Sequence, residues 1–283
     1  MTTEKIREKL DPADAESVVK KVRERYGSFA TAGTSCCGPA QMSCCSPTDT
    51  VASTLGYASA DLDLLPDSAN LGLGCGAPLE HLELAAGETM LDLGSGAGID
   101  ALIASRQVGV EGSVIGVDMT PEMLDAARAN AAAAGADNVD IREGRLENLP
   151  VEDATVDAVT SNCVINLVPD KSAVFKEISR VLRPGGRLVI SDIVLDGALP
   201  AKVRENVLAY VGCVSGAEQR DTYFGMLADA GLGDVEVIRD VDFLEMTEKA
   251  SPAEVQSILE ATGISKDAVI GIVRSVTYRA RKR

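Results

Sequence analysis

Short apolar segments alternate with helical segments between residues 89 and 193, and this alternation is the strongest constraint on the fold. Buried parallel strands read as short, continuous apolar runs, whereas the helices that connect them carry a polar face. The expected strands are 89–93, 113–117, 139–142, 156–160 and 187–193, and the expected helices between them are 98–107, 121–134 and 171–182. Repeated strand–helix units predict an α/β protein with a doubly wound, Rossmann-like sheet.

The segments on either side of this core have a different composition. Asp11-Pro12 predicts the start of a helix that runs to about Tyr26 and ends at Gly27. Residues 31–50 are rich in Gly, Ser, Thr, Pro and Cys, which predicts a loop or mobile arm, and a polar connector follows it. Beyond Pro200 we expect helices near 201–214, 219–230 and 252–262 and strands near 234–243 and 268–279.

The segment D-L-G-S-G-A-G at 92–98 follows the first expected strand and opens the next helix, as a nucleotide-binding loop requires. Gly94 and Gly96 let the backbone turn and approach a ligand closely. A nicotinamide-type G-x-G-x-x-G loop would need glycine where this chain has Ile99. The loop instead resembles that of S-adenosylmethionine-dependent methyltransferases, and no Lys or Arg for a phosphate lies between 89 and 105. The resemblance implies cofactor contacts from Asp92, Gly94, Ser95, Gly96 and Gly98.

Polar residues at two further strand ends lie where ligands bind in a sheet of this kind. Asp118 ends the second strand, where its carboxylate can accept hydrogen bonds from both ribose hydroxyls. Asn162 and Cys163 follow the strand that neighbours the first one in a doubly wound sheet. We therefore expect Cys163 to lie beside the methyl acceptor. The segment G-L-G-C-G at 72–76 follows no apolar strand, so we place no cofactor there.

The seven cysteines do not form the pattern of a disulfide framework. They occur as two vicinal pairs, Cys36-Cys37 and Cys44-Cys45, and as the single residues Cys75, Cys163 and Cys213. Seven cannot all pair within one chain, and the charged N-terminus lacks a signal peptide, so we expect a cytoplasmic protein with reduced thiols. A lone cysteine is often an inert buried side chain. Thiolates also select soft, thiophilic centres, and the three single cysteines could converge on a trivalent one.

The two vicinal pairs have several interpretations. Zinc sites favour two to four residues between cysteines, so adjacent cysteines match poorly. Exposed thiols on a flexible loop could instead exchange with disulfides or capture a soft metalloid, or they could be incidental. The chain's only histidine, His81, lies outside the expected core and is interpreted as a surface or structural residue.

The net charge excludes some partners. The chain has 27 Lys and Arg against 43 Asp and Glu, a formal net charge of −16. A surface this acidic repels phosphate backbones and anionic lipid, so we expect no nucleic-acid or membrane partner. No apolar run approaches the length of a membrane span. The charge suits a neutral or cationic small ligand, or simply keeps the protein soluble.

Several segments together resemble arsenite methyltransferases, in order and at compatible spacing, over about residues 20–232. They are V-R-E-R-Y-G, the double-cysteine arm, L-G-Y, N-L-G-L-G-C-G-A-P, L-D-L-G-S-G-A-G-I-D, G-V-D-M-T-P-E-M-L, S-N-C-V-I-N-L-V-P-D-K and L-R-P-G-G-R-L-V-I-S-D. The cysteine-bearing segments are specific to this family, whereas the others occur in many methyltransferases. The chain then divides into an N-terminal helix and Cys-rich arm (1–69), an S-adenosylmethionine-binding core (70–197) and an α+β region that covers the substrate (198–283).

The resemblance implies transfer of methyl groups from S-adenosylmethionine to trivalent arsenic, which detoxifies arsenic. Cys163 and Cys213 would bind arsenite or methylarsenite, and Cys75 would be the third thiolate for arsenite. The arsenic lone pair would attack the methyl carbon without an acid or base residue. Cys75 would then form a disulfide with an N-terminal cysteine, and thioredoxin or glutathione would reduce it. The candidate partners are Cys36, Cys37, Cys44 and Cys45.

The resemblance also implies contacts with the cofactor outside the glycine loop. Asp118 and Met119 would hold its ribose and adenine, and Asn162 would lie near its methionine part. Many methyltransferases carry an acidic residue where this chain has Arg145, so we expect the adenine contacts there from the backbone and from Leu146.

Two alternatives stay open. A methyltransferase acting on a quinone, a sterol or another carbon or oxygen acceptor would use the same sheet and loop. It would be expected to have an aromatic acceptor pocket, and aromatic residues make up only 3% of this chain. A thiol-based metalloid or zinc-binding protein without catalysis would not need the cofactor loop.

Overall fold

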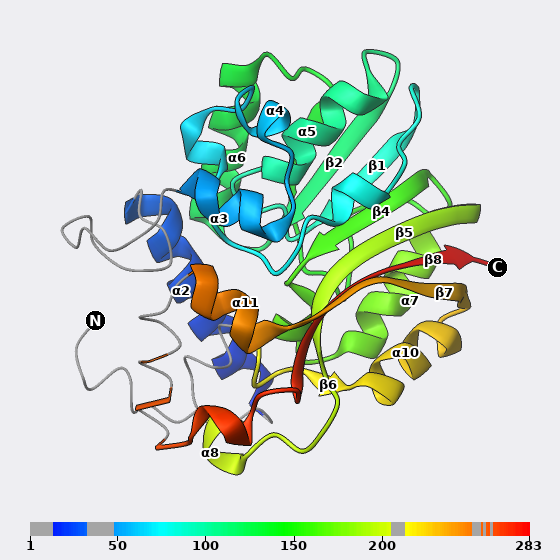
Figure 1. The fold of residues 1–283 in the computed structure, drawn as a ribbon. Helices are drawn as coiled ribbons and strands as arrows, with labels where there is room; N and C mark the ends of the chain where they lie inside the picture. Colours follow the sequence, from blue (N-terminus) through cyan, green and yellow to red (C-terminus); the bar gives the residue numbers. More distant parts are fainter. Residues whose placement is uncertain (1–13, 33–47, 205–212, 251–255, 257–258, 261–262) are drawn as a thin grey trace.

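The structure is a computed structural model, and it describes residues 14–32, 48–204, 213–250, 256, 259–260 and 263–283. The Cys-rich arm lies outside the described residues, as do Asp11 and most of the expected helix 252–262. The described chain is built around one sheet with helices on both of its faces (Figure 1).

In the described part of the chain, eight strands form a sheet with the order β3-β2-β1-β4-β5-β8-β7, and β6 pairs with β5. Their bounds are β1 Thr89–Leu93, β2 Ser113–Asp118, β3 Val139–Glu143, β4 Val156–Asn162, β5 Leu182–Leu195, β6 Glu218–Gln219, β7 Leu232–Asp242 and β8 Val273–Lys282. The first five strands pair in parallel, whereas β8 runs antiparallel to β5 and β7. The expected doubly wound sheet is confirmed, and the last two strands extend it from the C-terminal region. The three-part division of the chain stays a prediction.

The central strands are largely apolar because both faces of the sheet are covered. Successive residues of a strand point to opposite faces. Met90 accordingly packs in a core that includes α5, whereas Leu91 packs in a second core with α7 and α10. The helices between strands are α5 Ile99–Val108, α6 Pro121–Ala134, α7 Lys171–Val181 and α10 Arg220–Asp229.

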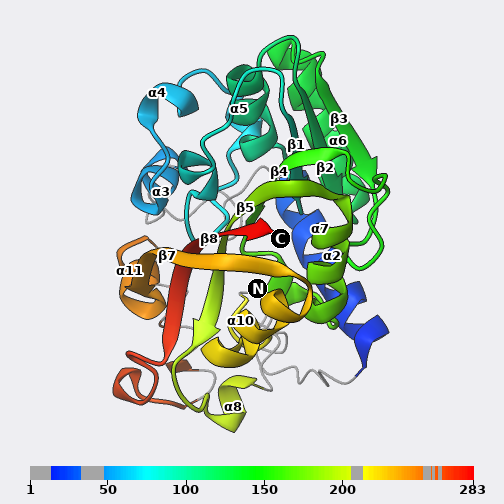
Figure 2. The ribbon, with the colours of Figure 1, turned by 90° about the vertical axis from the view of Figure 1, so that its right-hand side faces the viewer.

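The remaining helices cover the edges and the open end of the sheet. They are α2 Ala15–Ala32, α3 Thr48–Leu55, α4 Ser59–Leu62, α8 Ala201–Arg204 and α11 Phe243–Ala250, with short 3₁₀ turns η1 Asp67–Ala69, η2 Pro78–His81, η3 Ile165–Leu167 and η4 Lys266–Ala268. Helices α3 and α4 lie on the side of the sheet away from α7 and α10 (Figure 2). In the described residues, no helix is long and apolar enough to cross a membrane.

The expected end of the first helix at Gly27 is wrong, because α2 continues to Ala32. Gly27 serves close packing instead: a Cβ atom there would lie 2.8 Å from Oε2 of Glu122, at the start of α6. Asp14 precedes the helix and accepts a hydrogen bond from the N–H of Ser17 at 3.2 Å. The lack of a side chain at Gly27 therefore lets α2 lie across the end of α6.

Other differences follow from local backbone geometry. The expected helix 201–214 does not include Cys213, which lies in a turn with φ +64°. The polar connector contains α3 and α4, which the sequence analysis missed, as it missed α11. Strand β5 begins at Leu182, five residues before its expected start. The final strand begins at Val273, because a 3₁₀ turn precedes it.

Candidate active site

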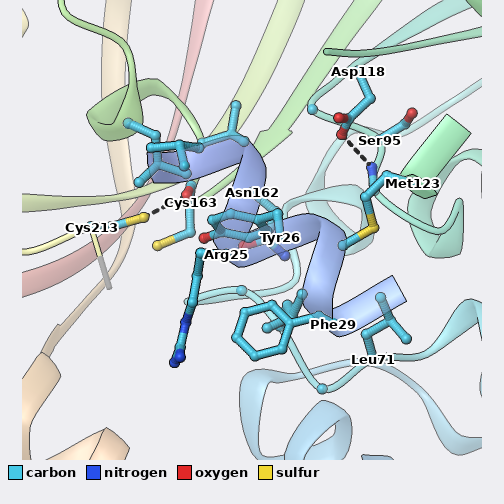
Figure 3. A pocket seen from close by; sticks show the side chains of 18 of the residues that line it. Arg25, Tyr26, Phe29, Leu71, Ser95, Asp118, Met123, Asn162, Cys163 and Cys213 are labelled. Carbon is cyan, nitrogen blue, oxygen red and sulfur yellow. Dashed lines mark hydrogen bonds between the residues drawn. The ribbon is translucent and has the colours of Figure 1, made fainter. Parts of the chain in front are cut away.

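A cavity of about 300 Å³ opens where the strand order reverses between β1 and β4. One part of its wall consists of the glycine loop and the end of β2, and another part contains two of the cysteines (Figure 3). Helices α2 and α11 contribute further residues. Such a switch point is where ligands bind in open α/β sheets.

The glycine loop after β1 adopts a backbone that only glycine accommodates well. Gly94, Gly96 and Gly98 have φ angles of +68°, +52° and +96°. A Cβ atom at Gly94 would lie 2.3 Å from Cγ2 of Val164. The loop is held by hydrogen bonds from the N–H groups of Gly94 and Ser95 to the carbonyl of Val117, at 2.8 and 3.1 Å. The backbone can therefore approach a ligand closely at this point.

Asp118 is fixed by backbone donors at the carboxyl end of β2. Its Oδ2 accepts a hydrogen bond from the N–H of Gly96 at 3.0 Å, and its Oδ1 accepts one from the N–H of Thr120 at 2.8 Å. Burial raises the pKa of Asp118, and these backbone bonds oppose that effect. A carboxylate oxygen has capacity for more than one hydrogen bond. Both oxygens can therefore also accept from the hydroxyls of a ribose.

Two buried polar atoms in this part of the cavity wall have no hydrogen-bond partner among the residues that the structure describes. They are Oδ2 of Asp92 and Oγ of Ser95, whose residues are 3% and 5% exposed. Burial, followed by the charges of Asp100 and Asp118, raises the pKa of Asp92 well above its usual value. Buried polar groups are normally satisfied. A ligand with a cationic amine and polar atoms, such as the methionine part of S-adenosylmethionine, fits these two groups.

The opposite part of the cavity contains the cysteines. The Cys213 thiol donates a hydrogen bond to the carbonyl of Cys163 at 2.7 Å, and the two side chains lie side by side (Figure 3). Hydrogen bonds with the thiols of Cys213 and Cys75, together with burial, raise the pKa of Cys163 well above its usual value. Burial raises the pKa of Cys75, which is fully buried behind the cavity wall. The structure thus brings all three single cysteines together, with Cys163 between the other two.

Asn162 connects Cys75 to the cavity. Its Oδ1 accepts a hydrogen bond from the N–H of Cys75 at 3.0 Å, and its Nδ2 donates to the carbonyl of Gly76 at 2.7 Å. Asn162 also lines the cavity, between the cofactor loop and Cys163. It therefore holds the backbone on one side of Cys75, in addition to its expected place beside the cofactor.

Helix α2 supplies four side chains that were not predicted as site residues. Val22, Arg25, Tyr26 and Phe29 line the cavity. Burial, followed by the charges of Cys213 and Cys163, raises the pKa of Tyr26 well above its usual value, so the phenol lies close to the thiols. The guanidinium of Arg25 lies 4.7 Å from the centre of the Phe29 ring. The motif V-R-E-R-Y-G at 22–27 was the only sequence signal for this part of α2, and it does not reach Phe29.

The remaining predicted residues lie either in the cavity wall or outside it. Met119, Arg145 and the buried Leu146 line the cavity near Asp118. His81 is exposed at the end of η2 and lies outside this cavity. In the described part of the chain, no group of three or more His, Cys, Asp or Glu side chains is arranged to hold a metal ion.

Comparison with known proteins identifies the family to which the chain belongs. Residues 84–260 match a family model described as a methyltransferase domain. An arsenite methyltransferase of Halobacterium salinarum is 47% identical over 233 residues, which is 79% of this chain and 59% of that protein. One of Aquipseudomonas alcaligenes is 39% identical over 59% of this chain and 50% of that protein. This chain therefore spans only half to three fifths of the length of these two relatives.

A solved structure is also similar. The arsenic(III) S-adenosylmethionine methyltransferase of Chlamydomonas reinhardtii has 30% sequence identity and a TM-score of 0.60. The similarity covers 83% of this chain and 73% of that one.

Proposed function

Because this chain belongs to the methyltransferase family, and within it to the arsenite methyltransferases, we propose that it methylates trivalent arsenic bound to cysteine thiolates. S-adenosylmethionine is the cofactor. The single observation that carries the proposal is the position of Cys163, which lines the cavity, accepts a hydrogen bond from the Cys213 thiol at its carbonyl and lies close enough to Cys75 to affect the pKa of that thiol. This grouping of thiols at a cofactor cavity suits a soft, trivalent acceptor.

The cofactor side of the cavity has a residue for each part of the cofactor. Asp118 would accept hydrogen bonds from the ribose hydroxyls, and Met119 and Leu146 would contact the adenine. The unpartnered atoms of Asp92 and Ser95 would receive the methionine end. When bound, S-adenosylmethionine supplies a methyl group on a positively charged sulfonium.

The cysteine side determines which arsenicals bind. Arsenite has three hydroxyls, and each condenses with one thiol to release water, so the inorganic substrate uses Cys75, Cys163 and Cys213. Methylarsenite has one arsenic–carbon bond and needs only two thiols, which we assign to Cys163 and Cys213. The Cys213 thiol donates to the backbone carbonyl of Cys163 in this structure, so it must turn toward the arsenic to bind it.

The chain's own groups position the substrate and exclude water. Nothing in this scheme requires a proton to be removed from the acceptor, because the arsenic lone pair is the nucleophile. Tyr26 and Phe29 of α2 and Phe243 of α11 cover the cavity from the outside of the sheet. Side chains from separate helices thus surround the reacting centre.

Methylation oxidises arsenic by two electrons, and formation of a disulfide from two thiols returns them. A thiolate of the N-terminal arm would attack the Cys75 sulfur, which breaks the arsenic–sulfur bond, leaves the electron pair on arsenic and forms the disulfide. The arm cysteine is Cys36, Cys37, Cys44 or Cys45, all outside the described residues. Thioredoxin or glutathione in the cytoplasm would then reduce the disulfide.

Calorimetric titration tests this proposal against its rivals. S-adenosylhomocysteine and arsenite are each expected to bind once per chain, and Cys163→Ser should remove arsenite binding while it keeps cofactor binding. A methyltransferase for a quinone or a sterol would bind the cofactor but not arsenite. A metalloid-binding protein would bind arsenite but not the cofactor. Either of these last two results would refute the proposed function.

A further inference from the structure

Tyr57 is buried, 4% exposed, directly after α3 and the positive-φ residue Gly56. Its hydroxyl donates to the carboxylate of Asp100, 3.0 Å from Oδ1 and 3.1 Å from Oδ2. It accepts a hydrogen bond from Nδ2 of Asn162 at 3.0 Å. Asp100 and Asn162 line the cavity, whereas Tyr57 lies behind them and connects the two.

The connection continues to Cys75. Asn162 uses its amide oxygen for the N–H of Cys75 and its amide nitrogen for both Tyr57 and the carbonyl of Gly76. A Cβ atom at Gly74 would lie 2.8 Å from Nδ2 of Asn162, so the loop packs directly against this amide. The bonds to the Cys75 N–H and the Gly76 carbonyl set which way the amide faces, and the Tyr57 hydroxyl, which accepts from the same Nδ2, anchors it from a third side.

The far side of the same loop is held separately. Oγ of Ser275, on β8, donates to the carbonyl of Cys75 at 2.6 Å. A Cβ atom at Gly76 would lie 2.5 Å from Oγ of Ser191, on β5. The loop is therefore held between the sheet and the Tyr57–Asn162 pair, and loss of the Tyr57 hydroxyl would release only one of its two sides.

We propose that Tyr57 is a positioning residue, which holds the Cys75 thiol beside Cys163 through Asn162 and is itself fixed by Asp100. The inference rests on the proposed function, because it concerns the thiol that only the inorganic substrate requires. It predicts a selective effect. Loss of the hydroxyl impairs the reaction that uses three thiols and spares the reaction that uses Cys163 and Cys213 alone.

The first test compares substrates in Tyr57→Phe. Because the Tyr57 hydroxyl anchors Asn162, we expect kcat/KM for arsenite to fall about 10- to 100-fold in this variant. We expect kcat/KM for methylarsenite to change less than about twofold. Tyr278→Phe is the matched control, because it removes another buried hydroxyl, bonded to that of Tyr223 at 3.3 Å, and should change neither value.

A second measurement does not depend on methylation. Alkylation of Cys75 by N-ethylmaleimide, followed by mass spectrometry of its peptide, reports how firmly the loop is held. Relative to Cys163, Cys75 should react several-fold faster in Tyr57→Phe than in the wild type. Asp100→Asn keeps an oxygen for the hydroxyl and should give the same selectivity with a smaller effect.

These measurements distinguish a failure of the proposed function from a failure of the positioning role of Tyr57. If the wild type methylates neither arsenical, the proposed function fails, and the alkylation rates still test the role of Tyr57. If both arsenicals are affected equally in Tyr57→Phe and Asp100→Asn, or if Cys75 reacts at its wild-type relative rate in both, the positioning role is refuted. In the double variant Tyr57→Phe/Cys75→Ser, methylarsenite turnover should equal that in Cys75→Ser, because both changes act on one thiol, and a further loss would contradict the positioning role.

Discussion

The thiol of Cys213 donates a hydrogen bond of 2.7 Å to the backbone carbonyl of Cys163. The two residues are 50 positions apart and both have left-handed backbones, with φ angles of +64° and +59°. This conformation costs a non-glycine residue about 1–2 kcal/mol. Two such residues in contact at a cavity are typical of a functional site, where the surrounding structure maintains the strain.

Serine variants of the three cysteines should affect methylation of arsenite and methylation of methylarsenite differently. Cys163→Ser and Cys213→Ser should each abolish methylation of arsenite and methylarsenite, since both substrates need these thiols. Cys75→Ser should abolish methylation of arsenite and keep methylarsenite activity. Initial rates with each arsenical provide the measurement. Normal arsenite turnover in all three variants would refute the thiol site.

The glycine loop should tolerate no side chain at Gly94. Its φ of +68° disfavours alanine, and a Cβ atom would lie 2.3 Å from Val164. Overpacking typically costs about 1–3 kcal/mol, so Gly94→Ala should weaken binding of S-adenosylhomocysteine at least about tenfold. Calorimetric titration measures this affinity.

Gly135→Ala is the matched control for the loop. Gly135 has a similar φ of +64°, at the end of α6, and nothing lies within 4 Å of a Cβ atom there. The change should cost about 1 kcal/mol of stability and leave cofactor affinity unchanged. If Gly94→Ala and Gly135→Ala changed the cofactor affinity equally, the close contact between residue 94 and Val164 would not matter for cofactor binding.

Asp92 should contribute to cofactor affinity through its unpartnered Oδ2. Asp92→Asn keeps the shape but removes the charge that would pair with the cofactor amine. The affinity for S-adenosylmethionine should fall about 10- to 100-fold, the value of a charged hydrogen bond. Asp140→Asn is the control, because Asp140 pairs with Arg142 on β3. Unchanged affinity in Asp92→Asn would exclude this contact.

Asp192 should make stability depend on pH. Burial raises its pKa from 3.8 to about 7, although Asn166, Ile193 and Tyr223 donate hydrogen bonds to it. The pKa of Asp192 is higher in the folded state than in the unfolded state. Its contribution to the free energy of unfolding is therefore fully present below about pH 4 and is lost as the pH rises through 7. Three pKa units correspond to about 4 kcal/mol.

Asp192→Asn removes this titration. The free energy of unfolding is measured in urea at several pH values. Between pH 4 and pH 8, the value for the variant should rise relative to that of the wild type by up to about 4 kcal/mol. The nearby ammonium of Lys171, which donates to the carbonyl of Val168, lowers the pKa of Asp192 and so limits this relative increase in stability. A constant difference between the two proteins over this range would show that Asp192 is not protonated in the folded state.

The features that could be predicted from the sequence are those set by local patterns. The strands, the glycine loop and Asp118 follow from short segments whose signals lie within a few residues. The place of Asn162 and Cys163 followed from one topological rule, and β4 indeed pairs with β1. In each case the prediction needed no knowledge of distant contacts.

The features that could not be predicted depend on tertiary contacts. Gly27 looked like a helix end, but α2 continues to Ala32 and brings Phe29 into the cavity wall. The bond between Tyr57 and Asp100 spans 43 residues. No periodicity signals such a pair, because it exists only once α3 and α5 have packed.

Product analysis tests the central claim most directly. The full chain is incubated with arsenite, S-adenosylmethionine and either glutathione or a thioredoxin system, and the arsenicals are separated by chromatography and identified by mass spectrometry. We expect methylated arsenicals, with one S-adenosylhomocysteine formed for each methyl group transferred. If arsenite stays unmethylated while the protein still binds the cofactor, the assignment of trivalent arsenic as the acceptor is wrong.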